Sequence, residues 1–169
     1  EETLKYLEEK YKLTESKLSE DIKRKVISLY IESTDKNLML LYLVNILTLN
    51  GETIVDDLPI SKEAPYTFKF DNNASKELEW KKSVAMNQKQ YSYNAEETLQ
   101  YLEDLFDIPS CLSPTIKRNL VSIRYALYLE RYRKYQPVTV ALDINDKTVA
   151  YVEENQTVLP GVFIDTDSL

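Results

Sequence analysis

The chain has 169 residues, of which 43% are hydrophobic and 29% charged, and its net charge is −7. This is the composition of a globular protein of one domain or two small ones. The negative charge argues against a general nucleic-acid-binding protein, which needs a positive field to displace counterions. Histidine is absent, which removes the commonest metal ligand and the usual general base, and the single Cys111 excludes an internal disulfide.

The chain is expected to divide at residue 36. Residues 1–36 read as a leading pair of amphipathic helices, and residues 37–169 as a second region. A repeat links the two regions, because EETLKYLEEKYKL at 1–13 closely matches EETLQYLEDLFDI at 96–108. A local duplication of helix pairs explains the repeat, and the alternative is that both copies dock against the same kind of partner surface.

Helices dominate the second region. Residues 37–49 are apolar almost all round, which predicts a buried helix, and Gly51 follows as a left-handed cap. Later helices are predicted to begin after residues whose side chains cap helix N-termini, with a proline at the first helical position in one case. These caps are Asn73, Asn94, Ser113 (followed by Pro114) and Asn145.

Short alternating segments predict strands at residues 66–70, 138–142 and 162–164. Between the last two, Leu159-Pro160-Gly161-Val162 predicts a turn. The fold class expected is therefore α+β, mostly helical with a small β-sheet that includes residues 138–142 and 162–164.

Several segments, in order, carry a resemblance to a known family. They are LYLVNILTLNGETIVDDLPI (41–60) followed by YTFKF, a Trp-Lys helix at 79–82, NAEETLQYLEDLF (94–106), and IRYALYLERYRKYQPVTVALDINDKTVAYVEENQTVLPGV (123–162). This order resembles the N-terminal pedestal, or dimerisation, region of class B penicillin-binding proteins from Gram-positive, clostridial-type bacteria. The family's Arg-Gly and Asp-Arg element, which follows its membrane anchor, has no match here.

The resemblance implies a non-catalytic stalk that holds a D,D-transpeptidase domain off the outer face of the bacterial membrane. It implies contact with that domain and with a membrane glycosyltransferase during peptidoglycan synthesis, and a membrane anchor upstream of Glu1. The alternative interpretation is a cytosolic helical adaptor without enzymatic activity. No nucleic acid is expected as a partner, and the membrane is expected to be reached only through an anchor outside this segment.

No catalytic, cofactor-binding or metal site is expected in this chain. Ser33-Thr34-Asp35-Lys36 matches the Ser-x-x-Lys of penicillin-binding proteins formally, but it falls in a predicted turn between helices. Lys147-Thr148 is followed by Val149 rather than by the glycine of the family's Lys-Thr-Gly strand. Paired acids such as Asp56 and Asp57 are interpreted as turn and cap residues.

A basic, tyrosine-rich segment at 117–134 is the candidate partner-binding site. It carries Lys117 and Arg118 at its start and a single acid, Glu130. The candidate residues are Arg124, Tyr128, Arg131, Tyr132, Arg133 and Lys134. This face would suit anionic lipid headgroups, teichoic acid or an acidic partner. The alternative is a solvated helix face whose long side chains pair with the protein's own acids.

Overall fold

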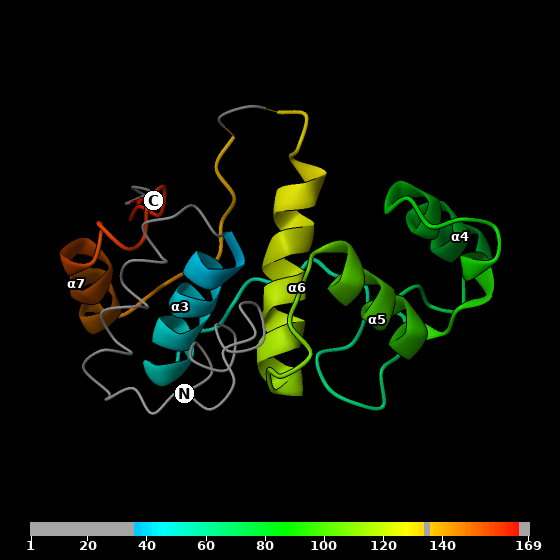
Figure 1. Ribbon diagram of the computed structural model, residues 1–169, viewed down its shortest axis with the longest axis horizontal. Coiled ribbons are helices and arrows are strands. Elements are labelled where there is room, and N and C mark those ends of the chain that lie inside the picture. The colour runs from blue at the N-terminus through cyan, green and yellow to red at the C-terminus, as the bar shows by residue number, and fades with distance from the viewer. Residues whose placement is uncertain (1–35, 134–135, 166–169) are drawn as a thin grey trace, which may run out of the picture.

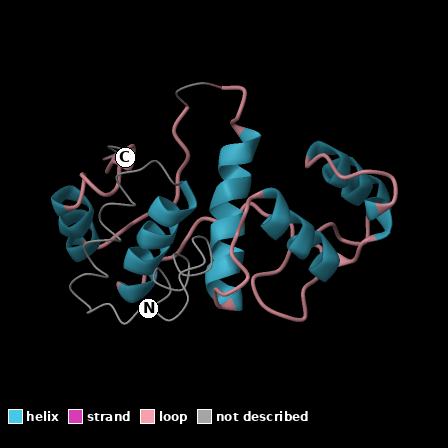
Figure 2. Ribbon diagram, in the orientation of Figure 1, coloured by secondary structure: helices cyan, strands magenta, loops and turns pink. Residues whose placement is uncertain are grey.

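The computed structural model describes residues 36–133 and 136–165, and within them the regular structure is helical (Figures 1 and 2). The elements, labelled as in Figure 1, are α3 (Lys36–Leu49), α4 (Ala74–Ser83), the short 3-10 helix η1 (Gln90–Ser92), α5 (Ala95–Leu105), α6 (Pro114–Leu129) and α7 (Asp146–Glu154). The leading helix pair predicted before residue 37, and with it the first copy of the repeat, lies outside the described residues except for Lys36.

Helix α6 is the centre of the arrangement. Helices α3 and α5 both pack against it, α7 lies beyond α3, and α4 lies beyond α5 (Figure 1). The prediction of a buried helix at 37–49 is confirmed, since α3 buries side chains around most of its circumference, Leu41 and Val44 completely. Burying a leucine fully stabilises the fold by about 2 kcal/mol relative to leaving it exposed, so the buried leucines of α3 contribute strongly to the stability of the core.

The predicted helix starts are confirmed at all four caps. The side-chain oxygen of Asn73 accepts from the Lys76 backbone N–H at 3.1 Å, and that of Asn145 accepts from Thr148 at 2.9 Å. Asn94 forms a reciprocal capping box with Glu97, each side chain accepting from the other residue's backbone N–H. At α6, Ser113 is the N-cap residue and Pro114 occupies the first turn.

The predicted left-handed cap at Gly51 and the predicted turn at residues 159–162 are both confirmed. Gly51 has a φ of +76° just after α3. Gly161 has a φ of +81° in the turn after α7, which the Val162 N–H closes by donating to the Leu159 carbonyl at 3.1 Å. Pro160 before a left-handed Gly161 is the pattern of a type II turn.

The α+β fold class is wrong for the residues that the structure describes. None of the predicted strands forms there, and pairing is limited to isolated antiparallel bridges between Ile54 and Ala141 and between Ile60 and Phe68 (Figure 2). Pro59 has no N–H to donate to a ladder. The Ser61 N–H donates to the Thr67 carbonyl and the Lys69 N–H to the Pro59 carbonyl, so the pairing with residues 67–69 is short. The carbonyls of Ile60 and Ser61 accept from the Arg118 side chain instead of continuing a ladder.

The polar stretch 87–94 is held against α4 by a buried lysine. Lys81 is only 1% exposed, and its ammonium lies 2.9 Å from the Tyr91 carbonyl, 2.6 Å from the Tyr93 carbonyl and 2.6 Å from the Glu77 carboxylate. The ammonium also lies 4.7 Å from the centre of the Phe68 ring. Three oxygen acceptors match the three donors of an ammonium group, which explains how this charge is buried.

Helix α4 is joined to α6 through its tryptophan. The indole N–H of Trp80 donates to the Tyr125 hydroxyl at 3.0 Å, and both groups are buried. The Trp80 ring also meets Phe70, with ring centroids 5.6 Å apart, and Phe68 at 6.0 Å. The short aromatic segment that had been predicted as a strand therefore packs as a side-chain cluster.

Candidate partner-binding site

The candidate site lies at the C-terminal end of α6, which extends past the ends of α3 and α5 (Figure 1). The helix ends at Leu129, and the chain turns through residues 130–133. Large apolar side chains are exposed here: Leu127 at 39%, Leu129 at 44% and Tyr132 at 83%. Exposed apolar side chains also occur elsewhere, as at Leu49 and Leu142, but here three of them fall between residues 127 and 132, next to arginines. Apolar side chains that gather in one exposed patch can mark a contact surface.

Arg131 is the organising side chain of this end. Its guanidinium carbon lies 3.8 Å from the centre of the Tyr128 ring and 4.5 Å from that of Tyr132. One guanidinium N–H donates to the Tyr128 carbonyl at 2.7 Å, which satisfies an acceptor at the end of the helix. A cation over an aromatic ring at an exposed site contributes roughly 0.5–1 kcal/mol, so the rings hold the guanidinium in place.

The other two arginines are less tightly held. Arg124 lies over the Phe106 ring at 5.5 Å, and that ring is 5.9 Å from Tyr128, so the aromatic surface continues toward α5. Arg133 lies 3.7 Å from the Glu130 carboxylate, but its side chain is 76% exposed. An ion pair of this kind contributes little.

Three of the predicted site residues, Tyr128, Arg131 and Tyr132, therefore contact one another, Arg124 is linked to them through Phe106, and Arg133 follows in the same turn of chain. We call these five residues the arginine–tyrosine tip. Lys134 lies outside the described residues. Within the described part of the chain, neither Arg124 nor Arg131 has a carboxylate within ion-pair distance.

The start of the basic segment follows the alternative interpretation instead. Lys117 pairs with the buried carboxylate of Glu103 at 2.7 Å. Arg118 is not part of the surface at all, being 2% exposed. The basic segment thus has two parts, one neutralised by the protein's own acids and one presented at the tip.

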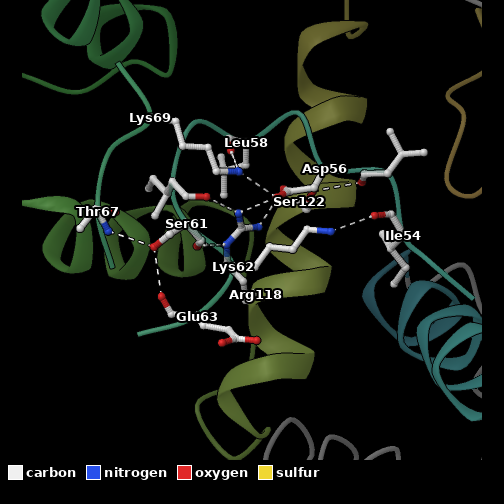
Figure 3. A network of polar contacts seen from close by, with 12 residues as sticks. Ile54, Asp56, Leu58, Ser61, Lys62, Glu63, Thr67, Lys69, Arg118 and Ser122 are labelled. Atoms are coloured by element: carbon white, nitrogen blue, oxygen red, sulfur yellow. Dashed lines mark hydrogen bonds and ion pairs between the residues drawn. The ribbon is translucent and has the colours of Figure 1, made fainter. Parts of the chain in front are cut away.

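Arg118 forms a buried polar network with the loop that follows α3 (Figure 3). Its guanidinium donates to both Asp56 carboxylate oxygens at 3.1 Å, a bidentate pair 62 residues apart in sequence. It also donates to the carbonyls of Ile60 at 2.6 Å and Ser61 at 3.0 Å. We call the pair of Arg118 and Asp56 the clamp, because it fixes the loop to α6.

Two further donors complete the coordination of Asp56. The Ser122 hydroxyl donates at 2.8 Å and the Lys69 ammonium at 3.1 Å. Burial alone raises the pKa of the Asp56 carboxyl, but the hydrogen bonds from Arg118 and Ser122, the Arg118 charge and Lys69 outweigh it. The pKa therefore lies below its ordinary value, and the carboxylate stays charged at neutral pH.

Sequence reasoning missed the clamp. It interpreted Asp56 as a turn residue and Arg118 as part of a basic surface. The available signal was that Arg118, Ser122 and Tyr125 recur at i, i+4 and i+7, which is a second stripe beside the apolar one. Two inward stripes indicate a helix buried on most sides, and a buried arginine needs a carboxylate partner.

Among the described residues, no group of three or more His, Cys, Asp or Glu side chains is arranged to hold a metal ion. A Ser-x-Asn triplet is present at 92–94, but the Ser92 hydroxyl donates to the Lys89 carbonyl and Asn94 caps α5. Of the formal Ser-x-x-Lys, Lys36 begins α3, whereas Ser33 lies outside the described residues.

No protein-family model matches the chain, and a search of curated proteins finds no significant match. No helix in the described ranges is long and apolar enough to cross a membrane.

Proposed function

We propose that this chain is the non-catalytic pedestal of a class B penicillin-binding protein, a peptidoglycan D,D-transpeptidase. In this proposal it holds the transpeptidase domain at the extracytoplasmic face of the bacterial membrane. It also contacts a membrane glycosyltransferase of the cell-wall machinery. An anchor outside this segment tethers the parent protein.

The observation that carries the proposal is that two of the resembling segments are parts of one packed unit. The DDLPI loop at 56–60 is fixed to α6 by the clamp, and α6 continues directly into the IRYALYLERY segment at 123–132. Val55 donates from its backbone to the Val140 carbonyl at 2.9 Å, which joins the same loop to the PVTVALD segment. Segments that resemble one family in sequence order also contact one another in space.

A stalk must move as one body to position a domain, and the buried contacts suit that role. Helix α6 has 16 residues, which is about 24 Å of helix. Residues 116–125 of this helix include the buried Arg118, Leu120 and Ser122, while Leu127 and Leu129 in its last turn are exposed. A fully satisfied buried polar network makes its surroundings rigid, so a displacement at the tip would be carried to the loop.

The cytosolic adaptor remains the second candidate, because the regular structure of the described residues is helical and the arginine–tyrosine tip is exposed. The coding sequence on either side of the segment separates the two proposals. A membrane anchor before Glu1, with Ser-x-x-Lys, Ser-x-Asn and Lys-Thr-Gly or Lys-Ser-Gly motifs after Leu169, is the expected result. A gene that encodes neither would refute the pedestal proposal.

A biochemical test uses the full-length parent protein. Deleting residues 37–165 should abolish its co-purification with the glycosyltransferase from the same genome, while fluorescent penicillin still acylates the transpeptidase domain. Retained acylation is the control that this domain is folded. Unchanged co-purification would contradict the proposed contact, and covalent penicillin labelling of the 169-residue chain at Ser33 would contradict a non-catalytic role.

A further inference from the structure

The arginine–tyrosine tip combines three features that are usually separate. It carries three arginines against one acid, Glu130, on a chain whose net charge is −7. Its tyrosines hold a guanidinium without a carboxylate partner among the described residues. Two exposed leucines, Leu127 and Leu129, flank it.

Each feature narrows what the tip can contact. A guanidinium with outward N–H groups suits phosphate or carboxylate oxygens, which it binds through two parallel hydrogen bonds. Exposed leucines and Tyr132 require a contact that also accepts apolar groups. Tyrosine and arginine side chains combine an apolar body with a polar end and are favoured where water meets hydrocarbon.

The shape and charge favour a flat surface over a groove on another protein. The C-terminal end of α6 projects past α3 and α5 in Figure 1. The exposed Leu127, Leu129 and Tyr132 belong to this end of the chain, as do Arg131 and Arg133. An anionic surface attracts this end and repels the acidic remainder of the chain, which orients α6 with its C-terminal end toward that surface. This complementarity of charge, together with the leucines, is met by a lipid bilayer that contains anionic phospholipids.

We propose that the arginine–tyrosine tip, with Leu127 and Leu129, docks reversibly on an anionic lipid bilayer. Arg131 and Arg133 contact headgroup phosphates, and the leucines and Tyr132 lie at the level of the headgroups. The inference depends on the proposed function for its biological setting, since a pedestal lies beside the membrane. It would give the parent protein a second membrane contact in addition to its anchor.

Sedimentation with vesicles tests the docking on the whole 169-residue chain. Vesicles of phosphatidylcholine with phosphatidylglycerol should bind it, and vesicles of phosphatidylcholine alone should bind far less. Each arginine near an anionic surface is worth about a fivefold change in partition, so Arg131→Gln with Arg133→Gln should weaken binding roughly 25-fold. Raising the salt from about 0.1 M to 1 M shortens the screening length from about 10 Å to 3 Å and should release most of the chain.

Four further variants show whether the tip itself is responsible. Lys76→Gln with Lys82→Gln removes the same charge from exposed positions on α4 and should change binding less than about twofold. Arg131→Lys with Arg133→Lys keeps the charge and should retain most of the binding. Leu127→Gln with Leu129→Gln should weaken the binding that remains at high salt, whereas Leu49→Gln, at an 84% exposed position on α3, should not.

Equal binding to both vesicle types would overturn the proposal, as would equal losses in the tip and α4 variants. It would also be overturned if the chain ignored vesicles while Arg131→Gln with Arg133→Gln abolished co-purification with the glycosyltransferase, because the tip would then be a protein interface. Failure with vesicles leaves the pedestal proposal to be judged by the flanking coding sequence, so the two failures are distinguishable.

Discussion

Replacing Asp56 with alanine should lower the free energy of unfolding by about 3 kcal/mol. The substitution removes the acceptor of four hydrogen bonds, two from Arg118 and one each from Ser122 and Lys69. Breaking a buried ion pair by removing one partner typically costs about 3–5 kcal/mol, because a charge is left buried without compensation. The lower end of this range applies here, since Arg118 keeps its hydrogen bonds to the carbonyls of Ile60 and Ser61.

Urea unfolding measures this loss, with Trp80 fluorescence and far-ultraviolet circular dichroism as parallel signals. Trp80 is the single tryptophan, and its contact with Tyr125 makes it report on the packing of α4 against α6. With a slope of about 2 kcal/mol per molar urea, a loss of about 3 kcal/mol lowers the midpoint by roughly 1.5 M. Coincident transitions from the two signals would show that unfolding is two-state.

A double-mutant cycle with Arg118→Met measures the coupling free energy between Asp56 and Arg118 apart from other effects of the substitutions. Replacing both partners removes the orphaned charge, so the double variant should be more stable than the sum of the single losses by at least about 2 kcal/mol. Lys69→Ala is the control, because Lys69 is 45% exposed and its pair with Asp56 should contribute less than about 1 kcal/mol. Additive losses, or an Asp56→Ala cost below about 1 kcal/mol, would refute the clamp as a stabilising element.

The remaining predictions concern pH, a cap and two backbone positions. Because the folded-state pKa of Asp56 lies below its unfolded value, the stability it contributes is present above about pH 4 and is lost as pH falls through the folded value. The difference in urea midpoint between the wild type and Asp56→Asn should therefore shrink below pH 4, and a constant difference down to pH 2 would contradict this. Asn94→Ala removes one side of the capping box and should lower the free energy of unfolding in urea by about 1 kcal/mol. Gln100→Ala on the same helix is the control and should cost less than about 0.5 kcal/mol, because it removes only an exposed hydrogen bond to Asp104. Both Gly51 and Ala85 have φ above +60°, which only glycine adopts without strain. In thermal unfolding, Gly51→Ala should therefore lower the free energy of unfolding by about 1 kcal/mol and Ala85→Gly should raise it by about the same amount. A destabilised Ala85→Gly would count against strain at that turn.

The helices were predictable because their signals are local. Asn73, Asn94 and Asn145 each cap a backbone N–H three residues away, so the sequence contains both partners of the interaction. The end of α6 has no such local signal, since the tyrosines that follow Ile123 suit either a helix or a strand. In the structure the helix ends at Leu129, and the Arg131 side chain donates a hydrogen bond to the Tyr128 carbonyl there.

The strands and the clamp could not be predicted in the same way, because both depend on residues distant in sequence. Alternation at 138–142 shows that a segment can be extended, but a strand also needs a neighbour to pair with, and here the pairing is limited to one bridge at Ala141. Asp56 and Arg118 are residue types that usually lie on the surface, and nothing local in the sequence indicates that they pair with each other across 62 positions. The sequence showed that residues 117–134 are basic and rich in tyrosine. It did not show that Lys117 and Arg118 pair with acids inside the protein, while Arg124 and Arg131 have no carboxylate within ion-pair distance in the described part of the chain.

Because Lys81 is buried, its reactivity reports how often α4 separates from the segment that contains Tyr91 and Tyr93. An amine-reactive reagent modifies lysines at a rate set by access, so the exposed Lys76 and Lys82 on the same helix should react promptly. Lys81 can react only when α4 separates from the carbonyls of Tyr91 and Tyr93. The ratio of its labelling rate to that of its neighbours, read by mass spectrometry, is therefore a direct measure of how often this end of the protein opens while the rest remains folded.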